Sequence, residues 1–575
     1  MRNKKFIRLF SYFKPYMGLL FLSLFLAFLI NLADLASPYI TKVIIDDYIS
    51  LKKPVVNIVL LGLLYLAAAL SGGVFNYIQA YLLNFLGQRI ILDIRMELFS
   101  HVQKMALSFF DKNSSGRILT RITNDVEVLN DFYSGVIVSL FKDILMLIGI
   151  IVVMLDMNVK LTLLSMSVIP IIIIVTFLYK NKARRNFMRI RRLIASINGF
   201  LAENIYGMRL VQIFNRQKEK YREFEKLNNE YNRASIFEMK LMALFKPASE
   251  LINSLAICIL IWYCIPGIFN SKIEIGVLYA FVTYAKKFFA PISDLADMYN
   301  TIVSAGVAAE RVFELMDDAG DVEDMDKGTK ISRIRGEIEF RHVWFSYDNK
   351  NWVLKDINFK VNKGETVAFV GATGSGKSTI INLIGRLYEI QKGEILLDGV
   401  NIKDIRLKDL RRAIAVVMQD VFIFSGDIKN NIRLDNKHIT DEQVVNAAKY
   451  SNAYDFIKNL PGKFNELVME RGCTLSSGQR QLLSFARAIA FKPSILVHDE
   501  ATANIDTETE RYIQKSLYKI SRNRTTIIIA HRLSTIKNAD KIIVINKGRI
   551  KEMGKHEELL RLGGIYKNLY DMQAV

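Results

Sequence analysis

The sequence predicts an α-helical membrane domain of six transmembrane helices with long cytoplasmic extensions, fused to an α/β domain. Three observations predict this fold class. Long uncharged apolar runs fill the first half of the 575 residues, and short β-type runs alternate with helical segments in the second half. Hydrophobic residues make up 51% of the chain and the mean hydropathy is +0.19, which indicates a membrane-embedded part.

The six membrane spans are predicted from the uncharged runs. A bilayer core about 30 Å thick needs about 20 apolar helical residues. The basic start of the chain and the length of the first run favour a retained span over a cleaved signal peptide. The runs cover residues 15–33, 54–88, 132–155, 161–179, 251–271 and 275–293, the third being interrupted by Lys142-Asp143 and the last by Lys286-Lys287.

The formal net charge of +20 is compatible with nucleic acid, anionic lipid or nucleotide as a partner. Basic clusters lie before the first apolar run and after the fourth, as the positive-inside rule expects for cytoplasmic segments. Nucleic acid is therefore not needed to explain the charge. The three cysteines form no C-x-x-C pair or His/Cys cluster, so no disulfide framework or zinc site is predicted.

Two long connections between spans, over residues 89–131 and 180–250, keep a helical periodicity with little Gly or Pro. A helix from Asn57 to about Met105 would be about 70 Å long, more than twice the thickness of the hydrocarbon core. We therefore expect membrane helices that continue into the cytoplasm and turn within residues 108–125 and 203–216.

The residue pattern changes after a charged, polar stretch, from long apolar runs to short β-type runs. We expect the membrane domain over residues 1–315, a linker over 316–335 and the second domain over 336–575. In the last region, runs such as TVAFVG, SILVHDE and TTIIIAH alternate with helical segments. This alternation predicts a largely parallel sheet, in which GEIEFRHVWFSY, AIAVVMQ and KIIVINKGRI are further strands.

A phosphate-binding loop follows the predicted strand TVAFV. The pattern G-x-x-x-x-G-K-S stands between a strand and a helix, which is the context that a nucleotide loop requires. Lys377 would reach the β- and γ-phosphates, and the Ser378 hydroxyl would ligate Mg²⁺. The motif identifies the second domain as an α/β P-loop ATPase domain, with the loop residues Gly371, Gly374, Ser375, Gly376, Lys377 and Ser378.

Two acids end the apolar strand SILVHDE. Asp499 fits the Mg²⁺-side carboxylate of P-loop ATPases, and Glu500 is placed to polarise the attacking water as the general base. Glu500 could instead only cap a following turn, but an acid pair at this position favours catalysis. His498 stands where an aliphatic residue is commoner and is interpreted as a core histidine without an assigned role.

From about Gly336 to the C-terminus the chain resembles the nucleotide-binding domain of ABC transporters, because that family's motifs occur in order. The resemblance implies that Tyr347 stacks on adenine and that Gln419 senses Mg²⁺. It also implies that residues 475–479 are the signature loop, that residues 503–506 are the D-loop, and that His531 holds the γ-phosphate. The implied ATP-binding residues are Tyr347, Gly371, Gly374, Ser375, Gly376, Lys377, Ser378, Thr379, Gln419, Ser476, Ser477, Gly478, Gln479 and Asp506; the catalytic ones are Glu500 and His531; and the Mg²⁺ ligands are Ser378, Gln419 and Asp499.

The N-terminal half resembles the membrane domain of type IV, or B-type, ABC exporters. Residues 109–125 look like the first coupling loop and residues 203–216 like the second. The resemblance implies an ATPase coupled to export, in a bacterial cytoplasmic (inner) membrane that the chain crosses several times. The N-terminus and the ATPase domain would be cytoplasmic, and ATP and Mg²⁺ would be the cofactors.

Ser477 occupies a position of the signature loop where the family usually has glycine. In this family two nucleotide-binding domains sandwich two ATP molecules, and each signature loop serves the site of the other chain. Either the chain is a homodimer that tolerates serine, or its partner is a second half-transporter with a degenerate catalytic site. We hypothesise the heterodimer, because the sequence resembles the catalytically intact subunit of bacterial heterodimeric multidrug exporters.

The transported substrate is not fixed by the membrane half. The favoured function is export of amphipathic small molecules, and the alternative is a homodimeric lipid flippase; an ATP-gated regulator has no positive support in the sequence. Lys142, Asp143, Lys286 and Lys287 would line a substrate path, or would pair structurally and snorkel to water. Membrane lipid and an amphipathic substrate are accordingly the expected non-protein partners.

Overall fold

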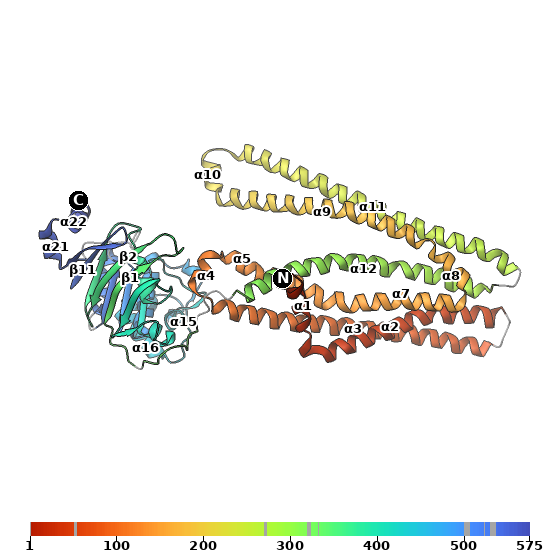
Figure 1. Ribbon diagram of the computed structural model, residues 1–575, viewed down its shortest axis with the longest axis horizontal. Helices are drawn as coiled ribbons and strands as arrows, with labels where there is room; N and C mark the ends of the chain where they lie inside the picture. Colours follow the sequence, from red (N-terminus) through yellow and green to blue (C-terminus); the bar gives the residue numbers. More distant parts are fainter. Residues whose placement is uncertain are drawn as a thin grey trace. The chain divides into compact units, whose positions relative to one another are not determined.

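The computed structural model describes residues 2–50, 55–269, 273–318, 324–331, 333–499, 507–521, 524–529 and 536–574 (Figure 1). Contacts divide the chain into two compact units, Met1–Ser100 with Ile118–Asp317, and His101–Arg117 with Asp318–Val575. Among the described residues every strand lies in the second unit. The segment His101–Arg117 packs as part of the second unit, although the residues on both sides of it in sequence belong to the first.

Within the described residues, six helical segments are long and apolar enough to cross a membrane, which confirms the predicted number of spans. They confirm the predicted fold class together with the sheets of the second unit. The helices from the N-terminus to the end of the membrane half are α1 (Arg2–Ser11), η1 (Lys14–Tyr16), α2 (Met17–Val43), η2 (Ile44–Ile49), α3 (Val55–Gln103), α4 (Leu107–Lys112), α5 (Ser115–Thr120), η3 (Arg121–Asp125), α6 (Val126–Asp131), η4 (Phe132–Val136), α7 (Ile137–Met157), α8 (Val159–Met166), α9 (Ile169–Tyr206), α10 (Met208–Ile213), α11 (Gln217–Phe269) and α12 (Ile275–Met316).

Four of these helices are much longer than the hydrocarbon core of a bilayer is thick. α3 has 49 residues, α9 has 38, α11 has 53 and α12 has 42, so α3 and α11 reach about 75–80 Å at about 1.5 Å per residue. α9 and α11 run side by side, and the short helix α10 lies at the turn between them (Figure 1). The predicted long extensions and both predicted turns are present.

Polar side chains and small residues join the membrane helices to one another. Apolar packing alone gives little advantage over contact with lipid, so hydrogen bonds and close backbone approach hold such bundles together. The Asn31 side chain donates to the carbonyl of Lys142 at 2.7 Å, and the Tyr284 hydroxyl donates to the carbonyl of Leu35 at 2.6 Å. At Gly149 a Cβ would collide with the Leu35 side chain, so glycine lets α7 approach α2 closely.

The second unit contains a six-stranded sheet in the order β12-β11-β3-β10-β9-β6 and a four-stranded sheet in the order β2-β1-β4-β5. In the larger sheet β11, β3, β10, β9 and β6 are parallel, as predicted, and only β12 is antiparallel. The strands are β1 (Ile338–Phe345), β2 (Leu354–Val361), β3 (Thr366–Val370), β4 (Lys392–Leu397), β5 (Val400–Asn401), β6 (Ile414–Val417), β7 (Gly426–Asp427), β8 (Leu467–Val468), β9 (Ile495–Asp499), β10 (Thr525–Ile529), β11 (Lys541–Asn546) and β12 (Arg549–Gly554).

One predicted strand belongs to the other sheet. The run GEIEFRHVWFSY forms β1, which pairs antiparallel with β2 and β4 and not with the parallel strands. The connection from β1 to β2 is short, and a short connection permits only antiparallel pairing, because a parallel pair needs a crossover of a dozen or more residues.

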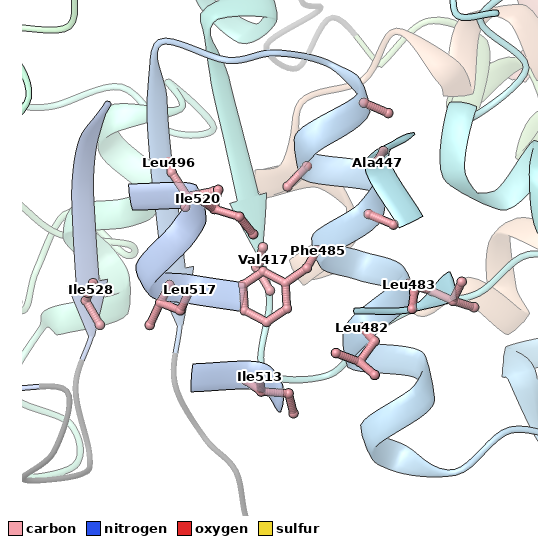
Figure 2. Close-up of a cluster of buried hydrophobic side chains, with 14 of the residues drawn as sticks. Val417, Ala447, Leu482, Leu483, Phe485, Leu496, Ile513, Leu517, Ile520 and Ile528 are labelled. Atoms are coloured by element: carbon pink, nitrogen blue, oxygen red, sulfur yellow. The ribbon is translucent and has the colours of Figure 1, made fainter. Parts of the chain in front are cut away.

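Helices cover the six-stranded sheet and bury its apolar side chains. On one face α18 and α19 cover the sheet and α16 packs against α18, and Phe485 of α18 lies beside Leu517 and Ile520 of α19 (Figure 2). The other face packs against α13 and the four-stranded sheet. The remaining helices are α13 (Lys377–Ile384), α14 (Leu407–Ala413), α15 (Ile428–Arg433), α16 (Asp441–Tyr450), α17 (Tyr454–Lys458), η5 (Lys463–Asn465), η6 (Glu470–Gly472), α18 (Ser477–Ala490), α19 (Thr507–Ser521), α21 (His556–Leu562) and α22 (Ile565–Ala574).

Candidate functional site

The predicted phosphate loop connects the end of β3 to the start of α13. Gly376 precedes α13 with φ 105°, a left-handed conformation that costs glycine little. A Cβ at Gly371 would collide with the main-chain carbonyl of Ile545 on β11. Because glycines let the backbone turn tightly here, the N–H groups at the start of α13 can face an anion.

Lys377 is the first residue of α13 and is only 6% exposed. Its ammonium group donates to the carbonyls of Gly371 at 2.7 Å and Ala372 at 3.0 Å. Burial lowers the pKa of Lys377. The side chain thus folds back over the loop and lies where phosphate oxygens could replace the carbonyls as acceptors.

The buried hydroxyl of Ser375 indicates that the loop fits a phosphate. Ser375 is 4% exposed, and its Oγ has no hydrogen-bond partner within the described part of the chain. A buried hydroxyl without a partner is costly, and an oxygen acceptor in the loop would satisfy it. The residues present therefore fit the phosphate groups of a nucleotide.

Side chains whose oxygens can bind a metal ion lie at the carboxyl ends of the parallel strands. Register pairs Phe369 of β3 with Ile529 of β10, and Ile529 with Asp499 of β9, so these strands end at one edge of the sheet. There the Ser378 hydroxyl donates to a carboxylate oxygen of Asp499 at 3.5 Å. Hydroxyl and carboxylate oxygens are ligands that Mg²⁺ prefers, with phosphate oxygens and water completing its shell.

Gln419 lies in the loop that follows β6 and is exposed. Val417 of β6 pairs with His498 of β9, so Gln419 follows a strand that ends at the same edge as Asp499. The structure thus places the predicted metal-side residues Ser378, Gln419 and Asp499 near the carboxyl ends of β3, β6 and β9, which are parallel strands of one sheet.

Tyr347 lies beside the phosphate loop and is 45% exposed. Its hydroxyl donates to Thr379 on α13 at 3.2 Å, which ties the ring to the helix that the loop precedes. The side chain is partly exposed, so stacking of the ring on a base stays a prediction. Phe345 and Tyr388 both contact the ring edge-to-face, with ring centroids 4.8 Å and 5.0 Å away.

Tyr388 is a residue that sequence reasoning missed. Its hydroxyl donates to the carboxylate of Asp111 on α4 at 2.5 Å, within the second unit. Burial and this hydrogen bond raise the pKa of Tyr388. Contacts therefore run from Tyr347 through Tyr388 to the segment that resembles the first coupling loop. No local pattern in the sequence indicates a pair that lies 277 positions apart.

The signature loop forms the start of α18. Ser476 caps the helix: its hydroxyl accepts from the N–H of Gln479 at 3.2 Å, and the Gln479 side chain accepts from the N–H of Ser476 at 2.9 Å. Ser477 is the first residue of the helix and Gly478 is buried. The loop is thus pre-formed at a helix N-terminus, where an anion binds favourably.

Three of the predicted residues, Glu500, Asp506 and His531, lie outside the described residues. In sequence, Glu500 directly follows β9. The remaining residues of the predicted site lie in one unit of the chain, at the phosphate loop, the adjoining strand ends and the separate signature loop.

His498 is a core residue, as the sequence interpretation held. It is 1% exposed on β9, and both ring nitrogens lack a hydrogen-bond partner among the described residues. Its ring lies 5.3 Å from that of Phe485 on α18. Burial lowers the pKa of His498 to about 4, so the imidazole is neutral at physiological pH.

Two family models match the chain. The model described as the ABC transporter transmembrane region matches residues 20–292, and the model described as ABC transporter matches residues 354–503. These matches correspond to the six-span unit and to the unit that carries the phosphate loop and signature helix.

Similar proteins match nearly the whole length of the chain. The chain is 42% identical over 523 residues to a protein of Bacillus subtilis (strain 168) named "Probable multidrug resistance ABC transporter ATP-binding/permease protein YheH", covering 90% of this chain and 77% of that protein. It is 36% identical over 574 residues to a protein of Desulfotalea psychrophila named "ATP-dependent lipid A-core flippase", covering 100% of both. A solved structure titled "Structure of a bacterial Atm1-family ABC exporter with ATP bound" matches with a TM-score of 0.79 and 27% identity, over 97% of this chain and 98% of that one.

Proposed function

The chain belongs to the ABC transporter family, as a fused half-transporter whose ATPase is coupled to transport, and from this premise we propose that it exports amphipathic small molecules from a bacterial cytoplasm. The observation that carries this proposal is the place of α4. This helix lies in sequence between two membrane spans, yet it packs within the ATPase unit through Asp111 and Tyr388. A change in the nucleotide site can therefore move the ends of two membrane helices.

The nucleotide-site residues take distinct roles in the proposed reaction. Lys377 would bind the β- and γ-phosphates, while Ser378, Gln419 and Asp499 would hold Mg²⁺, which offsets the phosphate charge. Glu500 would accept the proton of the attacking water, and His531 would hold the γ-phosphate and orient Glu500. Tyr347 would stack on the adenine.

A cavity in the membrane unit supports a substrate with both polar and apolar parts. It has a volume of about 430 Å³ and lies between α2, α3, α7 and α12. Lys287 lines it and pairs with Asp34 at 3.3 Å, and Lys142 lines it as well. Charges within spans usually face a bundle interior or an aqueous path. Lys142 and Lys287 are thus the charged residues that we place on the substrate path, whereas Asp143 is not part of this lining.

A lipid flippase remains the second candidate, because one relative that matches the whole chain is named for lipid A-core flipping. Drug-stimulated ATP hydrolysis would favour the multidrug exporter. Lipid-selective stimulation together with measured lipid translocation would favour the flippase.

We further propose that the functional unit is a dimer with two head-to-tail nucleotide sites, and that the N-terminus and ATPase domain face the cytoplasm. Ser477 would then face the site of the partner chain. Its added Cβ and hydroxyl would crowd a phosphate that glycine admits more closely, so that site would be weakened and not abolished.

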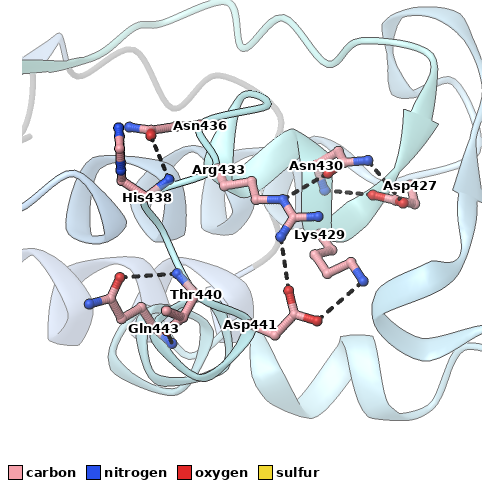
Figure 3. A network of polar contacts seen from close by, with 9 residues as sticks. All are labelled: Asp427, Lys429, Asn430, Arg433, Asn436, His438, Thr440, Asp441 and Gln443. Atoms are coloured by element: carbon pink, nitrogen blue, oxygen red, sulfur yellow. Dashed lines mark hydrogen bonds and ion pairs between the residues drawn. The ribbon is translucent and has the colours of Figure 1, made fainter.

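The test of this function uses the purified complex in lipid vesicles. Glu500→Gln should reduce ATP hydrolysis and uptake of an amphipathic dye about 100-fold or more, because removing a general base typically costs about 10²–10⁴-fold in rate. Binding of ATP should remain within about threefold of wild type. Asp441→Asn, which changes a surface carboxylate engaged by Arg433 and Lys429, is the control (Figure 3). Near-normal turnover of the Glu500→Gln complex would refute the role of Glu500 as base.

A further inference from the structure

Another cavity lies in the ATPase unit, at the end of α18 that is opposite to its signature loop. It has a volume of about 440 Å³ and lies among α16, the last residues of α18 and the last residues of α19. α18 has 14 residues, so about 20 Å separates this cavity from the start of the helix. Two of its lining residues, Ala447 and Ile520, are labelled in Figure 2, and Gln443 is labelled in Figure 3.

The charged lining of this cavity is entirely positive. Lys492, Lys519 and Arg524 line it, and no carboxylate is among its lining residues, all of which the structure describes. Asp441 stands at the start of α16, but it is bound by Arg433 at 2.9 Å and is not part of the lining (Figure 3). Three cations around one hollow repel one another unless an anion lies between them.

Arg524 shows that the positive charge is not fully compensated. One terminal guanidinium nitrogen of Arg524 is buried and has no hydrogen-bond partner among the described residues. Burial lowers the pKa of Arg524, as expected for a cation removed from water without an acceptor. Such a group is costly in a folded protein and is satisfied by a bound acceptor.

Helix ends explain only part of this arrangement. Cations near a helix C-terminus are stabilised by the helix dipole, which accounts for Lys519 on α19 and for Lys492 after α18. That effect does not supply a hydrogen-bond acceptor to the buried N–H of Arg524. Lys492 also adopts φ 48°, where glycine or asparagine is usual after a helix.

The floor of the cavity is apolar. Ala447, Ile489, Ala490 and Ile520 form it, and the ring of Tyr450 stands exposed at its rim. The volume exceeds what a single phosphate fills and lies within the range of small-molecule sites.

We propose that this cavity binds a small phosphorylated organic molecule, with its phosphate held by Arg524, Lys519 and Lys492 and its apolar part on Ile489, Ala490 and Ile520. The site is separate from the phosphate loop, because none of the loop residues lines it. Tyr450 supplies a ring against which a planar group of the ligand can stack. The proposal does not depend on which substrate the membrane unit exports.

Calorimetry on the purified full-length chain tests the proposal. Inorganic phosphate and AMP are titrated separately into the wild type and into Lys377→Ala, whose phosphate loop lacks its lysine. We expect one AMP per chain, bound more tightly than inorganic phosphate. Lys519→Gln and Arg524→Gln should each weaken both probes at least about tenfold, because each removes a charge-assisted hydrogen bond. Tyr450→Ala should weaken AMP alone.

The controls separate this site from the phosphate loop and from general charge. Lys437→Gln removes an exposed lysine outside the cavity and should leave both affinities unchanged. Because Lys519 is exposed, we expect Lys519→Gln to fold. If Arg524→Gln does not fold, the affinities of Lys519→Gln for the two probes test the proposal. Equal binding by wild type and Lys519→Gln would overturn the proposal. A signal that Lys377→Ala abolishes while both cavity variants retain it would overturn it too, since the probes would then occupy the phosphate loop.

Discussion

At the scale of single residues, His498 is a buried polar side chain next to the predicted metal ligand Asp499. Its neutral ring occupies a core position without a hydrogen bond among the described residues. We predict that His498→Leu raises the free energy of unfolding by about 1–3 kcal/mol at pH 7.5, because a buried polar group without a partner is replaced by an apolar one of similar size. The melting temperature of the purified protein, followed by intrinsic fluorescence, measures this.

His498 also predicts how stability depends on pH. Its pKa is about 4 in the folded protein and about 6.5 in an unfolded chain, so between these values the unfolded state binds more protons. Stability therefore falls as the pH drops from about 6.5 towards 4, by about 3 kcal/mol over the whole window. The Leu variant should lose less melting temperature than wild type between pH 7.5 and 5.5. His438→Leu, at an exposed position, is the control, and equal losses in all three proteins would contradict the prediction.

At the scale of elements, the contact between α4 and Tyr388 predicts a separation of hydrolysis from transport. Tyr388→Phe removes a hydrogen bond to a carboxylate, worth about 1.5–3 kcal/mol, while leaving the ring against Tyr347 in place. Basal ATP hydrolysis should stay within about twofold, and dye transport per ATP should fall about tenfold. Both are measured on the same vesicles.

A double-mutant cycle shows whether the partner is Asp111. If one hydrogen bond carries the effect, Tyr388→Phe in an Asp111→Asn background should cause little further loss. Tyr512→Phe, a half-exposed tyrosine of the same unit, should behave as wild type. Additive losses from the two substitutions would show that they act independently and would reject the coupling.

The turn that carries α10 predicts an interface with another chain. Tyr206 is 93% exposed and Phe214 is 69% exposed, and Ile205, Leu210 and Ile213 are also largely exposed. An apolar cluster at the end of a long hairpin marks a protein contact. Phe214→Ser should weaken dimer formation about tenfold or more, because burying one Phe side chain contributes about 1.5–3 kcal/mol.

Mass photometry of the solubilised complex, with ATP hydrolysis as a second measurement, tests this interface. The control is Tyr221→Ser, which changes an exposed aromatic residue on α11, beyond the turn. This variant should leave both measurements unchanged. An unaltered dimer in the Phe214→Ser variant would remove the turn from the interface.

Element patterns were largely predictable from the sequence, whereas long-range contacts were not. The six spans follow from the bilayer, because hydrocarbon excludes charge over a fixed thickness and leaves a long uncharged run in the sequence. The phosphate loop was predictable because its glycines serve the backbone locally. The antiparallel pairing of β1 in the smaller sheet was not predictable, because the residue pattern of a strand does not indicate its neighbour. The contacts of Tyr388 and Arg524 depend on how distant segments fold together, and no local pattern reports that.

For the whole molecule, Ser477 and Glu500 predict the composition of the complex. A chain with the catalytic glutamate and an altered signature loop supplies its Glu500 to one site and its Ser477 to the other. In a heterodimer, Ser477 would face the site that is built on the phosphate loop of the partner chain. That chain would lack the glutamate, so its site would hydrolyse little ATP and serine at position 477 would cost the complex little turnover. In a homodimer Ser477 would weaken both working sites. We therefore expect a second half-transporter chain to be present.

Purification from native membranes through a tag on this chain measures the composition. We expect a second transporter chain of similar size at a one-to-one ratio, with a residue other than glutamate at the position that matches Glu500. In that complex Glu500→Gln alone should abolish nearly all hydrolysis, and Ser477→Gly should change the rate less than twofold, because the site that Ser477 contacts contributes little turnover. Two copies of this chain alone would contradict the heterodimer and would favour the lipid flippase more strongly. Ser477→Gly should then raise the rate at both sites.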